Sequence, residues 1–297
     1  MAISLYRIKK WAKMLTGKSN LHVCQDEGKC YSVDSIKGYY NNLTEKVTLY
    51  GVEHGTIPLY PNEKGEMIEF AIGIFQYGLA SYDLFLMEQN KTYLEDAIYC
   101  GEWALKNQHN DGSWDCFGKG VYSSMAQGEA ISLLARLYIS TQDEKYLQPI
   151  MNAKKFLIKP IEEGGVAKKS GDSLILLEYV DKPLVLNGWI FSLWGLLDYC
   201  KLFPEDKESK QQYDASFDAM IRKLSEFDNG YWSLYNNEGM MASPFYHHLH
   251  INQLRAMFAL TSRNEFKEYS EKWEKYSNSW WNRKKAFAVK AIQKLTD

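Results

Sequence analysis

The chain has 297 residues, with 35 basic and 37 acidic side chains and a formal net charge of −2. This balance excludes a protein built mainly to bind nucleic acid, because such proteins need a basic surface. The hydrophobic share of 45% is ordinary for a globular protein with a sizeable core. The 21 Tyr and 9 Trp are unusual, and their flat faces with polar edges suit sugar rings as well as helical cores.

The five cysteines are scattered along the chain and form no CxxC pair, so neither a disulfide framework nor a structural zinc site is indicated. We expect reduced thiols in a cytoplasmic protein, with a Cys24–Cys30 bridge as the open alternative. The sequence has neither an apolar run long enough to span a membrane nor the apolar centre of a signal peptide.

The N-terminal part divides at about residue 66. Residues 1–18 place basic side chains between apolar ones and carry a tryptophan, a pattern typical of a helix on an anionic membrane surface. A helix packed on its own domain fits the same pattern equally well. Residues 24–61 are polar and rich in Gly, Tyr and Asn, which predicts an irregular arm or short strands. We therefore expect an N-terminal segment over 1–66 and one large domain over 67–297.

Helical periodicity begins near Met67 and predicts helices that pair as hairpins. The expected ranges are 67–88, 92–108, 122–140, 143–160, 184–203, 207–226, 246–262 and 264–282, with a basic amphipathic tail from Arg283. Gly/aromatic turns recur near Gly112, Gly164 and Gly230, where glycine can end a helix in the left-handed conformation. About four hairpins with a recurring turn predict an all-α fold of the α/α toroid type.

Tyr179, Tyr235 and Tyr246 lie in polar turns or at helix starts rather than in apolar stripes. A free phenol has a pKa of about 10, so it acts as a base only beside a group that favours proton transfer. Phenols placed around a sugar can remove and return a carbon-bound proton. The alternative is that these are three structural tyrosines among many.

Other polar residues near these turns are candidate ligand contacts. Glu178 can orient or deprotonate a phenol, hydrogen-bond a sugar or cap a loop, and Asn187 can donate to a carboxylate or satisfy backbone groups. Gln127 begins a helix of small residues, where close helix packing competes with a sugar contact. The spacing of His247, His248 and His250 could indicate a metal site, but the sequence offers no convincing further ligand. We favour hydrogen-bonding histidines, with no metal.

Several motifs together resemble the C-terminal catalytic region of D-glucuronyl C5-epimerases. Each motif is weak, but their order and spacing are fairly specific over residues 68–275. They are Phe75-Gln76-Tyr77-Gly78-Leu79, Asn107-Gln108, Gly112-x-Trp114, Ser124-Met125-Ala126-Gln127-Gly128, Glu178-Tyr179, Val185-Leu186-Asn187-Gly188, Asp228-x-Gly230 through Tyr235, and Tyr246-His247-x-x-His250-Ile251-Asn252-Gln253-Leu254.

The resemblance implies a helical α/α domain, of the stand-alone bacterial type, that converts glucuronate to iduronate in a polysaccharide or oligosaccharide such as heparosan. It implies catalysis by Tyr179, Tyr235 and Tyr246 without cofactor or metal. The residues expected to bind substrate are Gln76, Gln127, Glu178, Lys182, Asn187, His247 and His250.

The sequence also departs from the animal pattern of this family. Arginines that flank the second and third tyrosines there have no counterpart, and only Lys182 or Arg255 offers a nearby cation. A polysaccharide lyase shares the first proton abstraction and stays an alternative. A catalytically inactive glycan-binding protein of the same fold is the other alternative.

Overall fold

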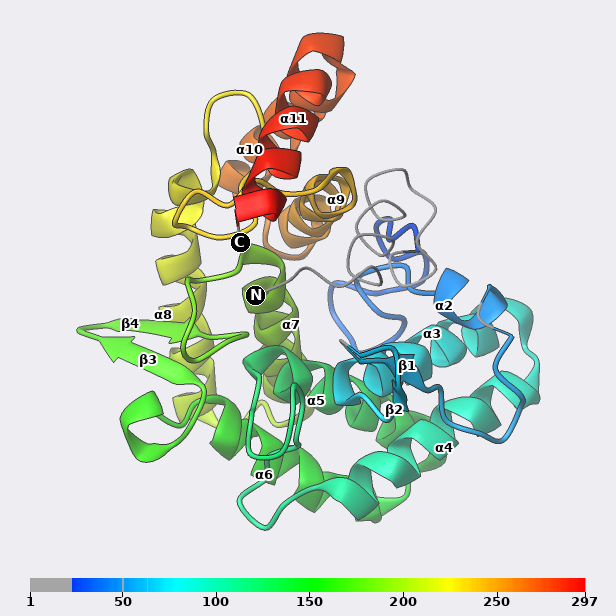
Figure 1. Ribbon diagram of the computed structural model, residues 1–297. Helices are drawn as coiled ribbons and strands as arrows, with labels where there is room; N and C mark the ends of the chain where they lie inside the picture. The colour runs from blue at the N-terminus through cyan, green and yellow to red at the C-terminus, as the bar shows by residue number, and fades with distance from the viewer. Residues whose placement is uncertain (1–22, 50, 63, 297) are drawn as a thin grey trace.

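The computed structural model describes residues 23–49, 51–62 and 64–296, and this part of the chain is mostly helical (Figure 1). The α-helices are α2 (Glu45–Thr48), α3 (Ala71–Glu88), α4 (Lys91–Asn107), α5 (Ser124–Thr141), α6 (Leu147–Leu157), α7 (Leu186–Leu202), α8 (Lys207–Lys223), α9 (Pro244–Thr261), α10 (Asn264–Asn278) and α11 (Trp280–Thr296). Two antiparallel strand pairs are β1 (Tyr60–Pro61) with β2 (Met67–Ile68), and β3 (Ala167–Ser170) with β4 (Ser173–Leu176). The predicted all-α class is confirmed.

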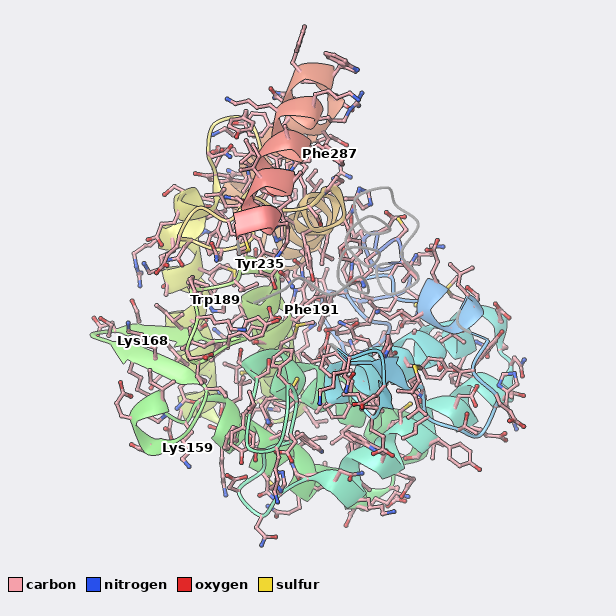
Figure 2. All side chains as sticks on the ribbon, viewed as in Figure 1. Lys159, Lys168, Trp189, Phe191, Tyr235 and Phe287 are labelled. Carbon is pink, nitrogen blue, oxygen red and sulfur yellow. The ribbon has the colours of Figure 1, made fainter. Side chains whose placement is uncertain are left out.

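Consecutive helices pair as hairpins, α3 with α4, α5 with α6, α7 with α8, and α9 with α10. The first helix of each hairpin also contacts the first helix of a neighbouring hairpin, α3 with α5, α5 with α7 and α7 with α9. These inner helices are buried on nearly all sides, as expected for helices that are apolar all round. Figure 1 shows the hairpins following one another along an arc, and Figure 2 shows Trp189 and Phe191 of α7 inside it. Closure of the arc into a toroid stays a prediction.

Three hairpins use the same tight connection between their helices. Gln89, Gln142 and Ser262 follow α3, α5 and α9 and take the left-handed conformation, with φ of 56°, 55° and 56°. The next residue is extended and leads directly into the following helix or 3₁₀ turn. This repeated geometry supports a repeat architecture, although the residues at the left-handed position are not glycines.

Helices α5 and α7 pack at backbone distance. A side chain on Gly128 would collide with the backbone of Ser192, and one on Gly195 would collide with the backbone of Gly128. The hydroxyls of Ser124 and Ser192 are 2.7 Å apart across the same contact. Close helix packing therefore accounts for the small residues at the start of α5.

The N-terminal arm is fastened to the helices by a buried ion pair. Arg136 Nη1 donates to Asp198 Oδ2 at 2.6 Å, and Arg136 Nη2 donates to the carbonyl of Gly38 at 2.9 Å. The hydroxyl of Tyr40 donates to Asp198 Oδ1 at 2.6 Å. Both ion-pair side chains are fully buried, so the arm shares the core of the helical domain.

The predicted boundaries are wrong in a few places, each for a local reason. The helix expected from Met67 begins at Ala71, because residues 67–68 pair as β2 with β1. The helix expected over 143–160 begins as a 3₁₀ turn and ends at Leu157, shortly before Pro160. Hairpin β3–β4 was not predicted, and the 264–282 helix is divided at Ser279 into α10 and α11.

The predictions on location have different outcomes. No helix of the described residues is both long and apolar enough to cross a membrane. All five cysteines are free, so the Cys24–Cys30 alternative is wrong. The amphipathic segment over residues 1–18 lies outside the described residues, and its membrane contact stays a prediction.

Replacement of Arg136 by Met is expected to destabilise the fold by about 3–5 kcal/mol, because it leaves the Asp198 carboxylate buried without its partner. Urea unfolding measures this change. Arg263→Met is the matched control, since its ion pair with Glu265 is solvent-exposed and contributes little to stability. Equal losses in the two variants would contradict the structural role of the buried pair.

Candidate active site

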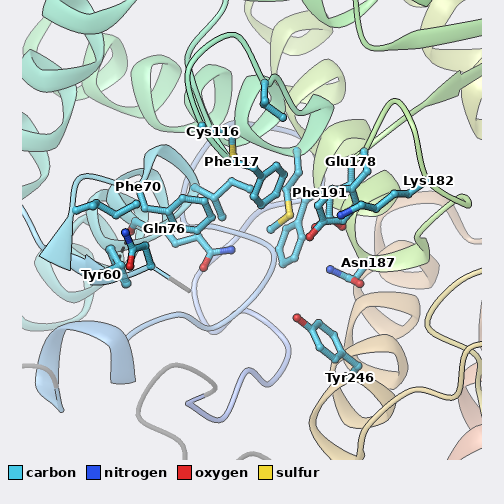
Figure 3. A pocket seen from close by; sticks show the side chains of 18 of the residues that line it. Tyr60, Phe70, Gln76, Cys116, Phe117, Glu178, Lys182, Asn187, Phe191 and Tyr246 are labelled. Atoms are coloured by element: carbon cyan, nitrogen blue, oxygen red, sulfur yellow. Dashed lines mark hydrogen bonds between the residues drawn. The ribbon is translucent and has the colours of Figure 1, made fainter. Parts of the chain in front are cut away.

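A cavity of about 810 Å³ opens where the arm meets the N-terminal ends of the inner helices. Its volume is within the range of small-molecule binding sites. Its lining comes from the arm, α3, the loop before α5, the turn before α7, and the start of α9. Figure 3 shows Gln76, Glu178, Asn187 and Tyr246 entering the cavity from these different elements. Six predicted site residues line it: Gln76, Glu178, Tyr179, Lys182, Asn187 and Tyr246.

Tyr179 lies in the turn that precedes α7 and is held on both faces. Its ring stacks on Phe117 with a centroid distance of 4.6 Å. The ammonium of Lys182 lies 4.5 Å from the centroid of the same ring. Such contacts fix the plane of the phenol and therefore the direction of its hydroxyl.

Tyr246 lies in the first turn of α9, because Ser243 caps this helix and Pro244 begins it. Its ring contacts that of Tyr235 with centroids 4.8 Å apart. Among the residues described, Tyr235 is not part of the cavity lining. The Tyr235 hydroxyl nevertheless hydrogen-bonds with the hydroxyls of Tyr179 and Tyr246, which do line the cavity. The three predicted tyrosines therefore form one cluster.

All three phenols are held protonated. Burial, and then the nearby Glu178 carboxyl, raises the pKa of Tyr179, Tyr235 and Tyr246 well above the ordinary value. None of them is a phenolate at neutral pH. Each is thus a proton donor, and a phenol that accepts a proton must pass its own proton to another group.

Glu178 has a pKa that suits it to accept a proton from a phenol at neutral pH. Burial raises the pKa of its carboxyl to about 7, while Tyr179 and Lys182 lower it by smaller effects. The carboxyl lies against the first turn of α7, where a side chain on Gly188 would collide with it. Glu178 Oε2 and Asn187 Oδ1 are buried without a hydrogen-bond partner. The cavity wall thus presents polar atoms that a bound ligand can satisfy.

Two further buried ionisable residues lie at or near this cavity: Glu129, a candidate sugar contact from the sequence alongside Gln127, and Lys46, which the sequence did not single out. Gln76 donates to Glu129 Oε1 at 2.7 Å, and Glu129 Oε2 has no partner. Burial raises the pKa of Glu129 well above its ordinary value. Lys46, from helix α2 in the arm, lines the cavity and is 4% exposed. The sequence does not predict this position of Lys46, because the arm has no regular pattern of apolar residues.

Gln127, His247 and His250 lie away from the lining. With its amide nitrogen facing Gly112, Gln127 donates to that carbonyl at 3.0 Å and accepts from the Trp114 amide at 3.3 Å. His247 stacks on Trp232, and Ser233 Oγ lies 2.7 Å from His247 Nδ1 and 3.1 Å from His250 Nδ1. Burial lowers the pKa of both histidines to about 3, so both are neutral. Direct sugar contact by these three residues stays a prediction.

Lys182 and Arg255, the two cations that the sequence offers near the tyrosines, differ in their access to a ligand in the cavity. Lys182 lines the cavity and is exposed. Arg255 Nη2 donates to Glu274 Oε1 at 2.5 Å and is not in the lining of the described cavity. Only Lys182 of the two is placed to meet a ligand.

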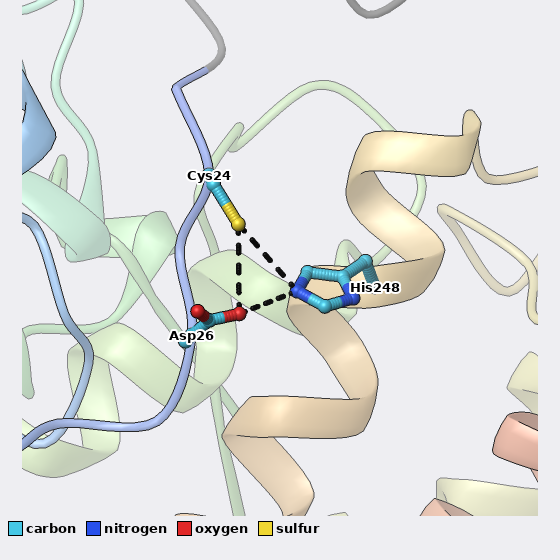
Figure 4. A group of neighbouring side chains, drawn as sticks. All are labelled: Cys24, Asp26 and His248. Atoms are coloured by element: carbon cyan, nitrogen blue, oxygen red, sulfur yellow. Dashed lines mark hydrogen bonds and ion pairs between the residues drawn. The ribbon is translucent and has the colours of Figure 1, made fainter.

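A metal-capable group lies outside the cavity, at the contact of the arm with α9 (Figure 4). Asp26 Oδ1 is 2.7 Å from His248 Nε2, and Cys24 Sγ is 3.5 Å from Asp26 Oδ1 and 3.8 Å from His248 Nε2. Thiolate, imidazole and carboxylate are ligands that zinc accepts. The ion pair of Asp26 with His248 explains the same arrangement, and the cavity chemistry does not involve it. Absence of a metal from the mechanism stays a prediction.

The helical hairpins surround a cavity lined by a buried acid and phenols, and sequence comparison gives the family. The model of the D-glucuronyl C5-epimerase C-terminus matches residues 96–275, and the chain belongs to this family. The chain is 26% identical over 222 residues to D-glucuronyl C5-epimerase of Caenorhabditis elegans, a match that covers 64% of this chain and 36% of that protein. It is 28% identical over 170 residues to an uncharacterized protein of Methanocaldococcus jannaschii, with 52% of each covered.

Glu178→Gln is expected to stabilise the protein at pH 8 by about 2–3 kcal/mol and to have little effect at pH 4. The folded-state pKa of about 7 lies above the ordinary value of 4.5, so the stability associated with the protonated carboxyl is lost as pH rises through 7. Urea unfolding at several pH values measures the difference. A constant difference between the two proteins from pH 4 to pH 8 would show that Glu178 is not held neutral by burial.

Proposed function

We propose that this cavity binds a uronic acid residue of a polysaccharide and inverts it at C5, converting glucuronate to iduronate. The observation that carries the proposal is the cluster of Tyr179, Tyr235 and Tyr246 around Glu178, a carboxyl with a pKa of about 7, at one cavity. Membership in the epimerase family supports the reaction class. Phe70, Phe117 and Phe191 in the lining supply apolar faces for sugar rings.

The proposed first step removes the C5 proton, which lies next to the uronate carboxylate. The C5–H bond breaks, its electron pair moves into the carboxylate to form an enediolate, and the proton goes to the Tyr179 oxygen. Tyr179 passes its own proton to Glu178, because Glu178 is its hydrogen-bond partner and has a carboxylate population at neutral pH. Donors such as Asn187 and Lys182 stabilise the enediolate.

The proposed second step delivers a proton from Tyr246 to the other face of C5. This leaves Glu178 with one extra proton and Tyr246 as phenolate. Tyr235 lies behind both pocket phenols and hydrogen-bonds to them, so it can return the proton from the Glu178 side to Tyr246. Its role is to connect the two phenols and reset their protonation rather than to touch the sugar.

The location of this activity is also a proposal. We infer a cytoplasmic protein, which the five free thiols support. Contact of residues 1–18 with an anionic membrane would bring the enzyme to a site of polymer synthesis.

Tyr179→Phe and Tyr246→Phe are each expected to lower exchange of the C5 proton at least 100-fold, since each removes one proton-transfer group. The measurement is incorporation of deuterium at C5 of heparosan-type and other glucuronate polymers in D₂O, followed by NMR. Tyr99→Phe, on the exposed side of α4, is the matched control.

The same samples separate the alternatives. Deuterium with iduronate signals supports the epimerase, and an unsaturated uronate product detected by its absorbance would identify a lyase. Binding of the polymer by the folded protein without exchange or cleavage would leave an inactive glycan-binding protein. Full exchange in both tyrosine variants would overturn the assigned residues.

A separate prediction concerns pH. Because Glu178 must be a carboxylate to receive the proton, kcat/KM is expected to fall about tenfold per pH unit below a pH near 7. Glu178→Gln, which keeps the shape of the side chain, should remove the activity at every pH. An activity that stays constant from pH 5 to pH 8 would exclude Glu178 as the acceptor.

A further inference from the structure

Lys46 is a buried cation at the wall of the active-site cavity. It lies on the short helix α2 of the N-terminal arm, is 4% exposed, and belongs to the cavity lining. Helix α2 packs against α3. The side chain therefore faces the same space as Glu178 and Tyr246, although it comes from a distant part of the sequence.

No counterion accompanies this ammonium within the described structure. Salt bridges are found there for the buried Arg136, with Asp198, and for Lys154, with Asp206, but none is found for Lys46. Glu129 is the acid whose charge acts on Lys46, and its carboxyl already accepts from Gln76. Burying a charge without a partner is costly, so folded proteins normally pair it or use it on a ligand.

We propose that Lys46 forms an anion-binding subsite that receives the carboxylate of a uronic acid residue bound in the cavity. This inference rests on the proposed function and names the contact that distinguishes an acidic sugar from a neutral one. It also supplies the cation that the sequence lacks at the positions of the family's arginines. Lys182 lies over the Tyr179 ring and is the second cation of the cavity lining.

Lys46 lines the same cavity as the proposed reacting groups, Glu178, Tyr179 and Tyr246. The charges of both Lys46 and Glu178 act on the pKa of Glu129. A carboxylate held at Lys46 is therefore near the groups that move the C5 proton. An ammonium at that carboxylate favours the enediolate over the starting uronate, because negative charge on the carboxylate oxygens increases when the proton leaves.

The charge state of Lys46 permits this role. Burial lowers the pKa of its ammonium to about 8, with Glu129 opposing the shift, so about nine-tenths of it is charged at pH 7. The acid of α3 on the arm side, Asp83, accepts from the Tyr39 amide at 2.8 Å and does not pair with Lys46. The other titratable groups of the lining are Tyr60, Cys116, Glu178, Tyr179, Asp181, Lys182 and Tyr246.

The test compares a heparosan-type tetrasaccharide with its carboxyl-reduced counterpart, by calorimetric titration at pH 7. Lys46→Met is expected to weaken binding of the acidic sugar about 10- to 100-fold, the usual effect of losing a hydrogen bond to a charged group. Binding of the neutral counterpart should not change. Lys119→Met is the matched control and should weaken acidic binding less than about threefold, because this ammonium is exposed and lies outside the cavity lining.

A pH series gives a second readout. Wild-type binding of the acidic sugar is expected to weaken as pH rises above about 8, where Lys46 loses its proton. Lys46→Arg keeps its charge, so its binding should stay constant up to pH 10. Lys46→Met removes a buried unpaired charge and should melt at an equal or higher temperature than the wild type. If Lys46→Met instead fails to fold, the comparison of Lys46→Arg with wild type decides.

The outcomes separate this inference from the proposed function. If wild type exchanges the C5 proton but Lys46→Met binds the acidic sugar as well as wild type does, the subsite is overturned and the epimerase proposal stands. If acidic binding depends on Lys46 without C5 exchange, the subsite stands and the epimerase proposal fails. If wild type binds the acidic and neutral sugars equally, or neither of them, the subsite is overturned.

Discussion

The contact between α5 and α7 is the constraint on which the site depends. Gly128 and Gly195 allow the two helices to touch at their backbones, and the hydroxyls of Ser124 and Ser192 join across the contact. Met125 in the first turn of α5 and Asn187 in the first turn of α7 line the same cavity. Larger residues at the two glycines would separate the helices and move these two walls apart.

The chemistry of the cavity depends on charges that the fold buries at a cost. Burial raises the pKa of Glu178 to about 7 and lowers that of Lys46 to about 8, so both titrate near neutral pH. A carboxyl and an amine with such values are poor contributors to stability and good partners for proton transfer and anion binding. Their burial next to an open cavity is thus better explained by a ligand than by the needs of the core.

The helical part of the fold could be predicted from sequence because the apolar period is strong and continuous. The three tyrosines could be found because polar turns interrupt that period at Tyr179 and Tyr235 and just before Tyr246. The left-handed connection at Gln142 was missed, since glycine is the usual signal for it. Lys46 was missed because the arm has no period, and its place at the cavity is fixed by contacts far apart in sequence, such as that of Arg136 with Gly38.

The region matched by the family model begins at residue 96. Some of the residues that line the cavity lie inside this region and others lie before it. Glu178 and the tyrosine cluster lie inside the matched region. Lys46 and Gln76 lie before it, on the arm and on α3. Under the proposed function, the arm contributes the cation that meets the sugar carboxylate and the matched region contributes the groups that move the proton, so the two parts of the cavity have separate tasks.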